Sequence, residues 1–361
     1  MIDTITASFP AISVVIPVYN AQKYIGAALS SCLAQTFQNF EVIVVDDAST
    51  DESAKIIKSY IPKFGGRLKV SVLKTNSGSP ATGRNKGLAM SRGKYVLFMD
   101  NDDLLVNKSL EQLYNFAENY NAELVIMDRV FHFINSTNKA FPDAEDLQIH
   151  AAQPFMLNSP TFESENPAEK MLKFAQFKIG VTPWHKFVLR DFLVENDIQF
   201  PILKNSEDIV WSLKIFFLAK RILTVPSPLY VYRINSDSIT RKARPLEETL
   251  NLFLDTIVEA LKILDEFFDS QEFFKENPQY RWALLNLVEC IPLNLLIKSV
   301  KSVTPYQFMD ILKPNFIDIF GKNGGLIAYL YAANTNGRLM NRELSERIAT
   351  LENKLKQLQE I

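Results

Sequence analysis

Residues 95–105 read Tyr-Val-Leu-Phe-Met-Asp-Asn-Asp-Asp-Leu-Leu, an apolar run followed at once by an acidic cluster. The run Tyr95–Met99 has the composition of a buried β-strand, so Asp100, Asp102 and Asp103 are expected at its carboxyl end, where open α/β sheets bind ligands. Crowded carboxylates repel one another unless a cation lies between them, and Mg²⁺ or Mn²⁺ takes such oxygen ligands together with substrate phosphates. The segment therefore predicts a metal and nucleotide site. Capping of the following helix by Asp103 is the structural alternative.

The chain as a whole has the composition of a soluble globular protein. Its 361 residues are 47% hydrophobic and 22% charged. The net charge of −2 gives no sign of the basic surface that binds nucleic acid. Two cysteines in so long a chain exclude a disulfide framework and indicate a reducing compartment. The N-terminus lacks a signal-peptide pattern, and the apolar stretch Leu284–Ile297 is too short and too polar to span a bilayer. We expect a cytoplasmic protein, and contact with the inner face of the membrane stays open.

Strand and helix patterns alternate over the first 130 residues. Strands are expected at Ile12–Ile16, Glu41–Val45, Lys69–Leu73, Tyr95–Met99 and Leu124–Met127, with helices at Lys23–Gln35, Ser53–Phe64, Ala81–Ser91 and Lys108–Tyr120. Such alternation is typical of βαβ units. It predicts a Rossmann-like α/β fold, with a mostly parallel sheet that is covered by helices on both faces.

The later part of the chain is less regular. Residues 130–166 are rich in Asn, Pro, Ser and acidic residues, and we interpret them as an excursion or lid. Short strands are expected at Ile222–Val225 and Leu229–Tyr232. A long amphipathic helix at Leu246–Phe268 is followed by more helical pattern to about residue 333, which predicts an α-helical C-terminal region.

The last residues carry a short coiled-coil pattern. The apolar and register-setting positions are spaced 3-4-3-4-3 at Asn341, Leu344, Ile348, Leu351, Leu355 and Leu358. This spacing predicts a homo-oligomer that forms through the C-terminal helices. The alternative is a helix that packs its apolar stripe on its own domain.

Polar clusters follow four consecutive strands of the predicted sheet, at residues 17–20, 46–51, 76–85 and 100–103. Because the carboxyl ends of parallel strands meet at one edge of the sheet, these clusters should converge on one crevice. A carboxylate such as Asp47 can accept a hydrogen bond from a ring N–H of a base, and Arg84 can neutralise a phosphate or orient a carboxylate. Helix capping by Asp47 and a surface position for Arg84 are the structural alternatives.

These segments, taken together, resemble the family 2 glycosyltransferases. The resemblance rests on Val14–Asn20, Ser31–Phe37, Glu41–Asp51, Gly83–Gly87 and the triplet Asp100-Asn101-Asp102, in the same order and spacing. It is dense over residues 10–130 and looser to about residue 240. The resemblance implies a GT-A fold, a nucleoside diphosphate sugar donor that is most often UDP-linked, a divalent metal, and inversion at the anomeric carbon.

The resemblance also implies roles for single residues. The nucleotide sugar would contact Pro17, Tyr19, Asn20, Asp47, Arg84, Asp100, Asn101 and Arg233. Within that set, Asp47 would bind the uracil ring, Arg84 would approach the base or the phosphates, and Arg233 would contact phosphate unless it forms a structural ion pair. Asp102 would be the direct ligand of Mn²⁺ or Mg²⁺, with Asp100 beside it.

An inverting transfer also needs a base that takes the proton of the acceptor hydroxyl. The family puts this base in an acidic pair ahead of a helix, which Ser206–Trp211 fits, so Asp208 is the expected base and Glu207 would orient the acceptor. A charge pair that favours the helix dipole is the alternative. Trp184 and His185 stand where the family usually has Trp-Asn-Lys and are expected near the acceptor, with a purely structural His as the alternative.

The sequence thus predicts an inverting glycosyltransferase that moves a sugar from a UDP-sugar to a hydroxyl of a glycan or lipid-linked acceptor, by metal-assisted single displacement. Its expected setting, bacterial surface polysaccharide synthesis such as lipopolysaccharide or capsule, follows from the family alone. The expected organisation is a GT-A domain at 1–240 (donor half 10–130, acceptor half 131–240), a helical region at 241–335 and a coiled-coil-like tail at 336–361. The alternatives are a non-catalytic scaffold of a polysaccharide assembly and a sugar-1-phosphate nucleotidyltransferase, whose Gly-rich loop is replaced here by Pro17–Asn20.

Overall fold

The structure is a computed structural model that describes residues 9–133, 147–151, 159–176, 178–234, 246–285 and 287–288. The chain divides into two compact units. One comprises Met1–Arg241 with Glu266–Leu284, and the other comprises Lys242–Asp265 with Leu285–Ile361. All predicted site residues belong to the first unit.

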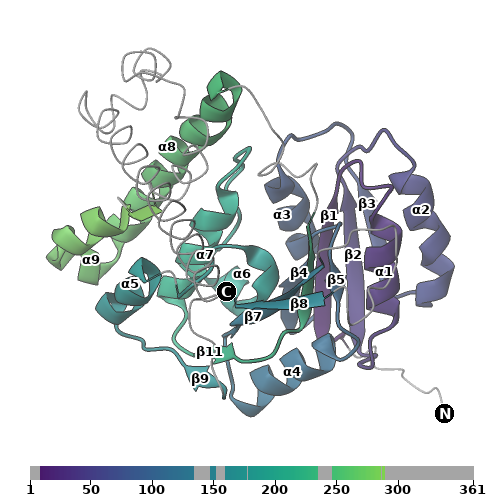
Figure 1. Ribbon diagram of the computed structural model, residues 1–361, viewed down its shortest axis with the longest axis horizontal. Helices are drawn as coiled ribbons and strands as arrows, with labels where there is room; N and C mark the ends of the chain where they lie inside the picture. The colour runs from purple at the N-terminus through teal and green to yellow at the C-terminus, as the bar shows by residue number, and fades with distance from the viewer. Residues whose placement is uncertain are drawn as a thin grey trace, which may run out of the picture. The chain divides into compact units, whose positions relative to one another are not determined.

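An eight-stranded sheet forms the centre of the first unit (Figure 1), in the order β3-β2-β1-β4-β10-β6-β11-β9. Its strands are β1 Ile12–Val18, β2 Phe40–Asp46, β3 Leu68–Val72, β4 Tyr95–Phe98, β6 Leu124–Met127, β9 Thr161–Phe162, β10 Lys186–Leu189 and β11 Ile222–Val225. Strands β1 to β4 are mutually parallel, and β10 runs antiparallel between β4 and β6. Every residue of β1 and β2 is buried, as expected for strands that are covered on both faces.

Two layers of helices cover this sheet, because successive side chains of a strand point to opposite faces. The helices are α1 Ile25–Leu33, α2 Ser53–Tyr60, the 3-10 turn η1 Ile61–Phe64, α3 Pro80–Met90, α4 Ser109–Asn119, α5 Pro167–Ala175, the 3-10 turn η3 Pro183–His185, α6 Arg190–Glu195 and α7 Glu207–Leu218. Val14 and Ile16 of β1 pack in one core cluster with residues of α1, α2 and α4. Val15 packs in another with residues of α3, α6 and α7. The predicted α/β fold with a mostly parallel sheet is confirmed.

A second, four-stranded sheet has the order β5-β12-β7-β8. It consists of β5 Leu104–Leu105, β12 Tyr230–Arg233, β7 Arg129–Phe133 and β8 Leu147–Ala151. The segment 130–166, interpreted as an excursion or lid, contains strands in its described part, where β8, β9 and most of β7 lie. Strand β7 pairs with both β8 and β12 and buries Val130 and Phe133. The polar composition of the whole segment concealed this short apolar alternation.

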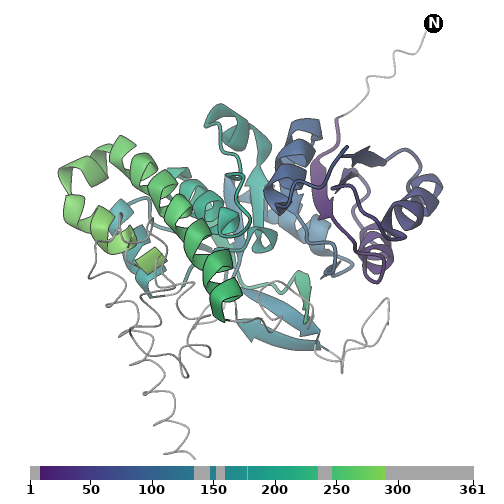
Figure 2. The ribbon, with the colours of Figure 1, turned by 90° about the horizontal axis from the view of Figure 1, so that it is seen from above.

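The C-terminal region begins with two helices, α8 Leu246–Ser270, drawn in green in Figure 2, and α9 Glu272–Glu276. The predicted helix at Leu246–Phe268 thus matches α8 to within two residues. Within the first unit, Phe217, Phe268 and Phe274 pack with ring centroids 4.7–5.4 Å apart. None of the helices in the described ranges is long and apolar enough to span a membrane. The predicted coiled-coil-like tail at 336–361 lies outside the described residues.

Candidate active site

The polar clusters expected at the strand ends do meet at one edge of the sheet. Strands β1 and β2 pair in register, with Val18 beside Asp46, and the backbone N–H of Asp47 donates to the carbonyl oxygen of Val18 (2.7 Å). The side chain of Asn101, after β4, donates to the carbonyl oxygen of Pro17 (2.9 Å). Loops that are far apart in the sequence are thereby joined into one site.

Asp47 lies in a cradle of hydrogen-bond donors from the loop after β3. Its carboxylate accepts from the backbone N–H of Ser77 (2.9 Å), the hydroxyl of Ser77 (2.8 Å) and the side-chain amide of Asn76 (3.2 Å). Gly78 follows at φ +72°, a left-handed conformation that favours glycine. The cradle fixes the direction of a carboxylate that is only 8% exposed.

Asn20 joins the loops after β1 and β2. Its backbone N–H donates to the hydroxyl of Ser49 (3.0 Å), and its side-chain oxygen accepts from the backbone N–H of Thr50 (2.8 Å). Asn20 is held at φ +48°, which Asn tolerates better than most residues. The neighbouring Tyr19 is 47% exposed and leaves an aromatic ring open at the edge of the site.

Arg84 connects two acidic segments of the site. Its Nη2 lies 2.9 Å from Oδ1 of Asp100, and its Nη1 lies 2.8 Å from Oε1 of Glu207. Burial alone would lower the pKa of Arg84, but the two carboxylates outweigh it and raise that pKa. Both terminal nitrogens are thus engaged with protein carboxylates, and Glu207, expected to orient the acceptor, pairs with Arg84 instead.

The glycines on either side of Arg84 explain its position on α3. A Cβ at Gly87 would lie 2.3 Å from Cγ1 of Val15, and a Cβ at Gly83 would lie 2.8 Å from Cβ of Pro17. Only residues without a side chain allow α3 to approach β1 this closely. The helix therefore carries a buried arginine next to the strand end.

Asp208, the expected base, stands beside the Arg84 ion pair at the start of α7. It is half-buried, and one carboxylate oxygen accepts from the backbone N–H of Ile209 (2.8 Å). Loss of hydration and the neighbouring Glu207 raise the pKa of Asp208 to about 7, against the opposing effect of Arg84. A carboxylate with such a pKa can exchange protons near neutral pH.

Asp103, the last carboxylate of the acidic cluster, points inward. It is fully buried, and its two oxygens accept from the hydroxyl of Tyr230 (2.8 Å) and the backbone N–H of Arg233 (2.8 Å). Burial and the nearby charges of Asp102 and Asp100 raise its pKa well above the usual range. Asp103 is therefore a structural carboxylate that holds β12.

Two half-buried carboxylates, Asp100 and Asp102, are left for the predicted metal. Among the residues that the structure describes, no group of three or more His, Cys, Asp or Glu side chains is arranged to hold a metal ion. The carboxylate oxygens nevertheless fit Mg²⁺ or Mn²⁺, because such ions are commonly held by one or two carboxylates together with water and substrate phosphates. The residues present are thus compatible with a metal that is shared with the substrate.

Arg233 has a buried guanidinium, two of whose nitrogens have no hydrogen-bond acceptor in the described part of the chain. It is 3% exposed, and its Nε and Nη2 find no hydrogen-bond partner within the described ranges. The guanidinium carbon lies 5.3 Å from the ring of Tyr24 and 5.5 Å from that of Phe133. Burial lowers the pKa of Arg233 despite the nearby Asp103. A buried guanidinium with two nitrogens that lack acceptors is well suited to bind an anion.

Comparison with known protein families matches residues 13–196, just over half of the chain, to Glycosyl transferase family 2. The chain belongs to this family. The resemblance on which the sequence analysis relied is therefore confirmed.

Two curated relatives are similar to this chain over more than half of its length. The chain is 31% identical over 223 residues to poly(ribitol-phosphate) beta-N-acetylglucosaminyltransferase TarS of Staphylococcus aureus, covering 61% of this chain and 35% of TarS. It is 32% identical over 237 residues to the putative glycosyltransferase EpsH of Bacillus subtilis, covering 64% of this chain and 63% of EpsH. The chain thus spans about a third of the length of TarS.

Solved structures support the GT-A fold. Residues 1–349 of S. aureus TarS in complex with UDP-GlcNAc superpose with a TM-score of 0.64 at 22% identity, covering 91% of each chain. The mannosyltransferase PcManGT of Pyrobaculum calidifontis, in complex with GDP-Man and Mn²⁺, has a TM-score of 0.51 at 16% identity, covering 91% of this chain and 87% of its own. At these identities the likeness concerns the fold alone.

This family 2 chain departs from the family's Trp-Asn-Lys pattern at His185, which proves to be interior. His185 is 1% exposed, its Nδ1 lies 2.6 Å from the hydroxyl of Thr182, and its Nε2 lies 3.1 Å from Nζ of Lys186. Burial and Lys186 lower its pKa well below the usual range, so the imidazole is neutral. The structure therefore does not bring His185 to an acceptor. Trp184 stacks on Tyr230 (4.8 Å between centroids) and on Tyr232 (5.6 Å).

Sequence reasoning assigned no individual role to Ser77, Lys186 or Tyr230, although Lys186 and Tyr230 lie in segments that resemble the family. Ser77 and Tyr230 bind carboxylates that lie 30 and 127 positions away, so no local pattern reveals them. Lys186 did offer a signal, because a lysine that opens a buried strand must find acceptors. Its Nζ donates to the carbonyl oxygens of Gly180 (2.8 Å) and Thr182 (2.6 Å).

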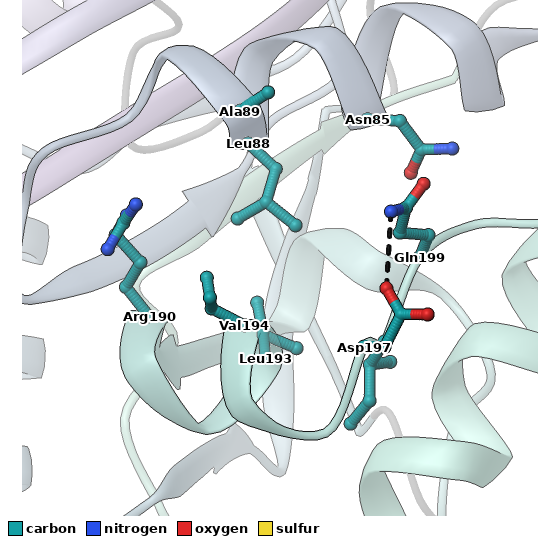
Figure 3. A pocket seen from close by; sticks show the side chains of 9 residues that line it. Asn85, Leu88, Ala89, Arg190, Leu193, Val194, Asp197 and Gln199 are labelled. Atoms are coloured by element: carbon teal, nitrogen blue, oxygen red, sulfur yellow. Dashed lines mark hydrogen bonds between the residues drawn. The ribbon is translucent and has the colours of Figure 1, made fainter.

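A separate cavity lies between α3 and α6 (Figure 3). It holds about 300 Å³ and is lined by Asn85, Leu88, Ala89, Arg190, Leu193, Val194, Asp197, Ile198 and Gln199. Asn85 exchanges two hydrogen bonds with the backbone of Phe200 (2.8 and 2.9 Å), and Gln199 donates to Asp197 (3.4 Å). None of the predicted site residues lines this cavity, so it is distinct from the site described above.

Proposed function

We propose that the chain is an inverting glycosyltransferase that moves a sugar from a UDP-sugar to a hydroxyl of a glycan or lipid-linked acceptor. The observation that carries the proposal is the double ion pair of Arg84. It joins Asp100, in the acidic loop after β4, to Glu207, which precedes the candidate base Asp208. A donor-binding acidic loop and a candidate base are thereby held next to each other, as a displacement at one carbon atom requires.

The donor would be held at both ends of its nucleoside diphosphate. Asp47, fixed by Ser77 and Asn76, is suited to accept a hydrogen bond from the ring N–H of uracil. Arg233 is suited to the diphosphate, since two of its buried nitrogens lack acceptors in the described part of the chain. These contacts support a nucleotide with a ring N–H and a diphosphate.

Asp102 and Asp100 would hold a divalent ion. When bound, Mn²⁺ or Mg²⁺ supplies Lewis acid stabilisation of the diphosphate leaving group. The protein's own contribution is to fix the direction of Asp100, through Arg84 at its carboxylate and through Tyr230 at its backbone N–H (3.1 Å).

Asp208 would act as the base of a single displacement. The acceptor oxygen attacks the anomeric carbon, the bond from that carbon to the UDP oxygen breaks, and the hydroxyl proton passes to the Asp208 carboxylate. Its pKa of about 7 suits this role, because a base is most effective when its pKa lies near the working pH. Attack from the face opposite the leaving group inverts the anomeric configuration.

The acceptor and its setting belong to the same proposal. TarS is named for transfer to poly(ribitol phosphate), a polymer that is rich in hydroxyl groups. We infer a surface glycan or glycolipid as the acceptor of this chain, in a reaction on the cytoplasmic side of the membrane. The half-buried rings of Trp184 and Tyr232, which stack on each other, support a carbohydrate acceptor, because an aromatic face offers an apolar surface to a sugar ring.

Calorimetric titration of UDP, with and without Mn²⁺, tests the donor site. NMR of the sugar that is released from a panel of UDP-sugars then tests inversion. We expect metal-dependent binding and a first-formed product whose anomeric configuration is opposite to that of the donor. A folded protein that neither binds UDP nor cleaves any UDP-sugar would favour the scaffold alternative, and retained configuration would exclude single displacement.

A further inference from the structure

We propose that Tyr230 is a positioning residue that couples the acidic loop Asp100–Asp103 to Arg233 and to Trp184. This inference rests on the proposed function and names the residue that joins its donor and acceptor parts. Tyr230 is fully buried at the start of β12. Its hydroxyl and its ring contact different parts of the site, which is the basis of the coupling.

The hydroxyl of Tyr230 closes a chain of hydrogen bonds through the acidic loop. It accepts from the backbone N–H of Asp100 (3.1 Å) and donates to the carboxylate of Asp103 (2.8 Å). The other oxygen of Asp103 accepts from the backbone N–H of Arg233 (2.8 Å). Because a buried carboxylate without donors is costly, Asp103 binds both ends of β12 to the loop.

The backbone reinforces this arrangement. Strand β5 follows Asp103 directly and pairs antiparallel with β12, with Leu105 opposite Tyr230 and Leu104 opposite Val231. The loop that carries Asp100 and Asp102 is thus held to β12 by main-chain pairing after it and by the Tyr230 hydroxyl within it. Movement of β12 would therefore move the loop.

The ring of Tyr230 extends the coupling to the acceptor side. It stacks on Trp184 with centroids 4.8 Å apart and planes 13° apart. The Tyr230 side chain therefore contacts the loop that carries Asp100 and Asp103 and the ring of Trp184, and its own strand carries Arg233. Removal of the hydroxyl separates these functions, since Tyr230→Phe keeps the stack and loses both hydrogen bonds.

The chain offers a matched control in Tyr95 of β4. Tyr95 is 2% exposed, donates to the Glu118 carboxylate (2.8 Å) and stacks on Phe187 (4.9 Å between centroids, planes 21° apart). Tyr95→Phe therefore removes the same kind of bond, from a tyrosine hydroxyl to a carboxylate, in the eight-stranded sheet and away from the site. A merely structural role for Tyr230 would make the two variants alike.

The experiment measures two quantities in the full-length wild type, Tyr230→Phe and Tyr95→Phe. Calorimetry with UDP and Mn²⁺ gives the Kd, and amide hydrogen exchange reports on residues 100–103 and 230–233. For Tyr230→Phe we expect a Kd raised about tenfold, the typical effect of losing a group that orients metal ligands, and faster exchange in both segments. For Tyr95→Phe we expect a Kd within about twofold of the wild type and unchanged exchange there.

The outcomes separate this inference from the proposed function. If the wild type binds UDP and both variants bind equally well, Tyr230 is not a positioning residue and the donor site stands. If the wild type does not bind UDP, the proposed donor fails, and hydrogen exchange alone decides the coupling. Equal exchange of both segments in the two variants would then overturn it.

Discussion

The two acidic segments of the site, Asp100–Asp103 after β4 and Glu207-Asp208 at the start of α7, are built alike and differ in one respect. Each gives one carboxylate to Arg84, at 2.9 Å for Asp100 and 2.8 Å for Glu207. Each also contains a second carboxylate that burial makes harder to ionise. The shared arginine neutralises part of both segments and holds the acidic loop after β4 next to the start of α7.

The difference lies in the donors around the second carboxylate. Asp103 accepts from a tyrosine hydroxyl and a backbone N–H and is fully buried. Asp208 is half-buried, and Ile209 is its hydrogen-bond donor. A carboxylate whose oxygens are engaged by fixed donors serves the structure, whereas one that faces the site with a raised pKa is available for proton transfer.

The first test of this difference removes the proton acceptor. Asp208→Asn should lower the turnover of UDP-sugar by roughly a hundredfold to ten-thousandfold, the usual contribution of a general base, and leave the Kd for UDP unchanged. UDP release and calorimetry measure the two quantities. The control is Asp191→Asn, whose side chain is 72% exposed on α6. Turnover of Asp208→Asn near the wild-type value would mean that another group takes the proton.

Removal of the shared arginine tests the likeness of the two segments. Arg84→Met leaves Asp100 and Glu207 without their cation, and loss of one partner of a buried ion pair costs about 3–5 kcal/mol. Urea unfolding should show a decrease of that order in the free energy of unfolding. The control is Lys55→Met, because its ion pair with Glu52 is exposed (2.7 Å) and such pairs contribute about 1 kcal/mol or less. Equal losses of unfolding free energy in both variants would contradict a stabilising role for the buried ion pairs of Arg84.

Removal of the expected metal ligand tests the outer part of the acidic loop. Asp102→Asn should weaken UDP binding in Mn²⁺ by more than roughly tenfold, since even residues that only orient metal ligands contribute that much. The midpoint of urea unfolding should change little, because Asp102 is half-buried. Asp100→Asn is the comparison, and it should lower both affinity and stability, since Asp100 also binds Arg84. Metal-dependent affinity that is unchanged in Asp102→Asn would contradict the ligand assignment.

The sequence predicted the parts of the molecule that local patterns control. Leu124–Met127 was predicted to the residue, and β4 to within one, because an apolar strand between polar loops is a local signal. The convergence of the strand ends followed from parallel topology, which the observed order of β3, β2, β1 and β4 bears out.

Contacts between distant segments were not predictable in the same way. Glu207 was assigned to the acceptor, but it pairs with Arg84, which lies 123 positions away. His185 was expected near the acceptor, but it fills a buried space beside Gly180, where an added Cβ would lie 2.8 Å from Cε1 of the imidazole. Such pairings depend on how helices pack on the sheet, which neither composition nor spacing encodes.

The smallest expected effect is on the pH dependence of stability. It is tested at Asp208, with the exposed Asp191 as the control. The folded-state pKa of Asp208, about 7, is above its ordinary value of 3.8. Between these values the folded protein binds more protons than the unfolded chain, so stability falls as pH rises. Asp208→Asn mimics the protonated form and escapes this loss. Its stability relative to the wild type should therefore increase between pH 4 and pH 8, on the order of 1 kcal/mol for a half-buried group.

Thermal unfolding of Asp208→Asn, Asp191→Asn and the wild type at several pH values measures this increase. Asp191→Asn should show no such trend, because its side chain is 72% exposed. The trend should flatten above about pH 7, where the wild-type carboxylate is already ionised in the folded state. A stability difference between Asp208→Asn and the wild type that stays constant across the range would mean that Asp208 ionises normally. Its suitability as a base at neutral pH would then rest on its position alone.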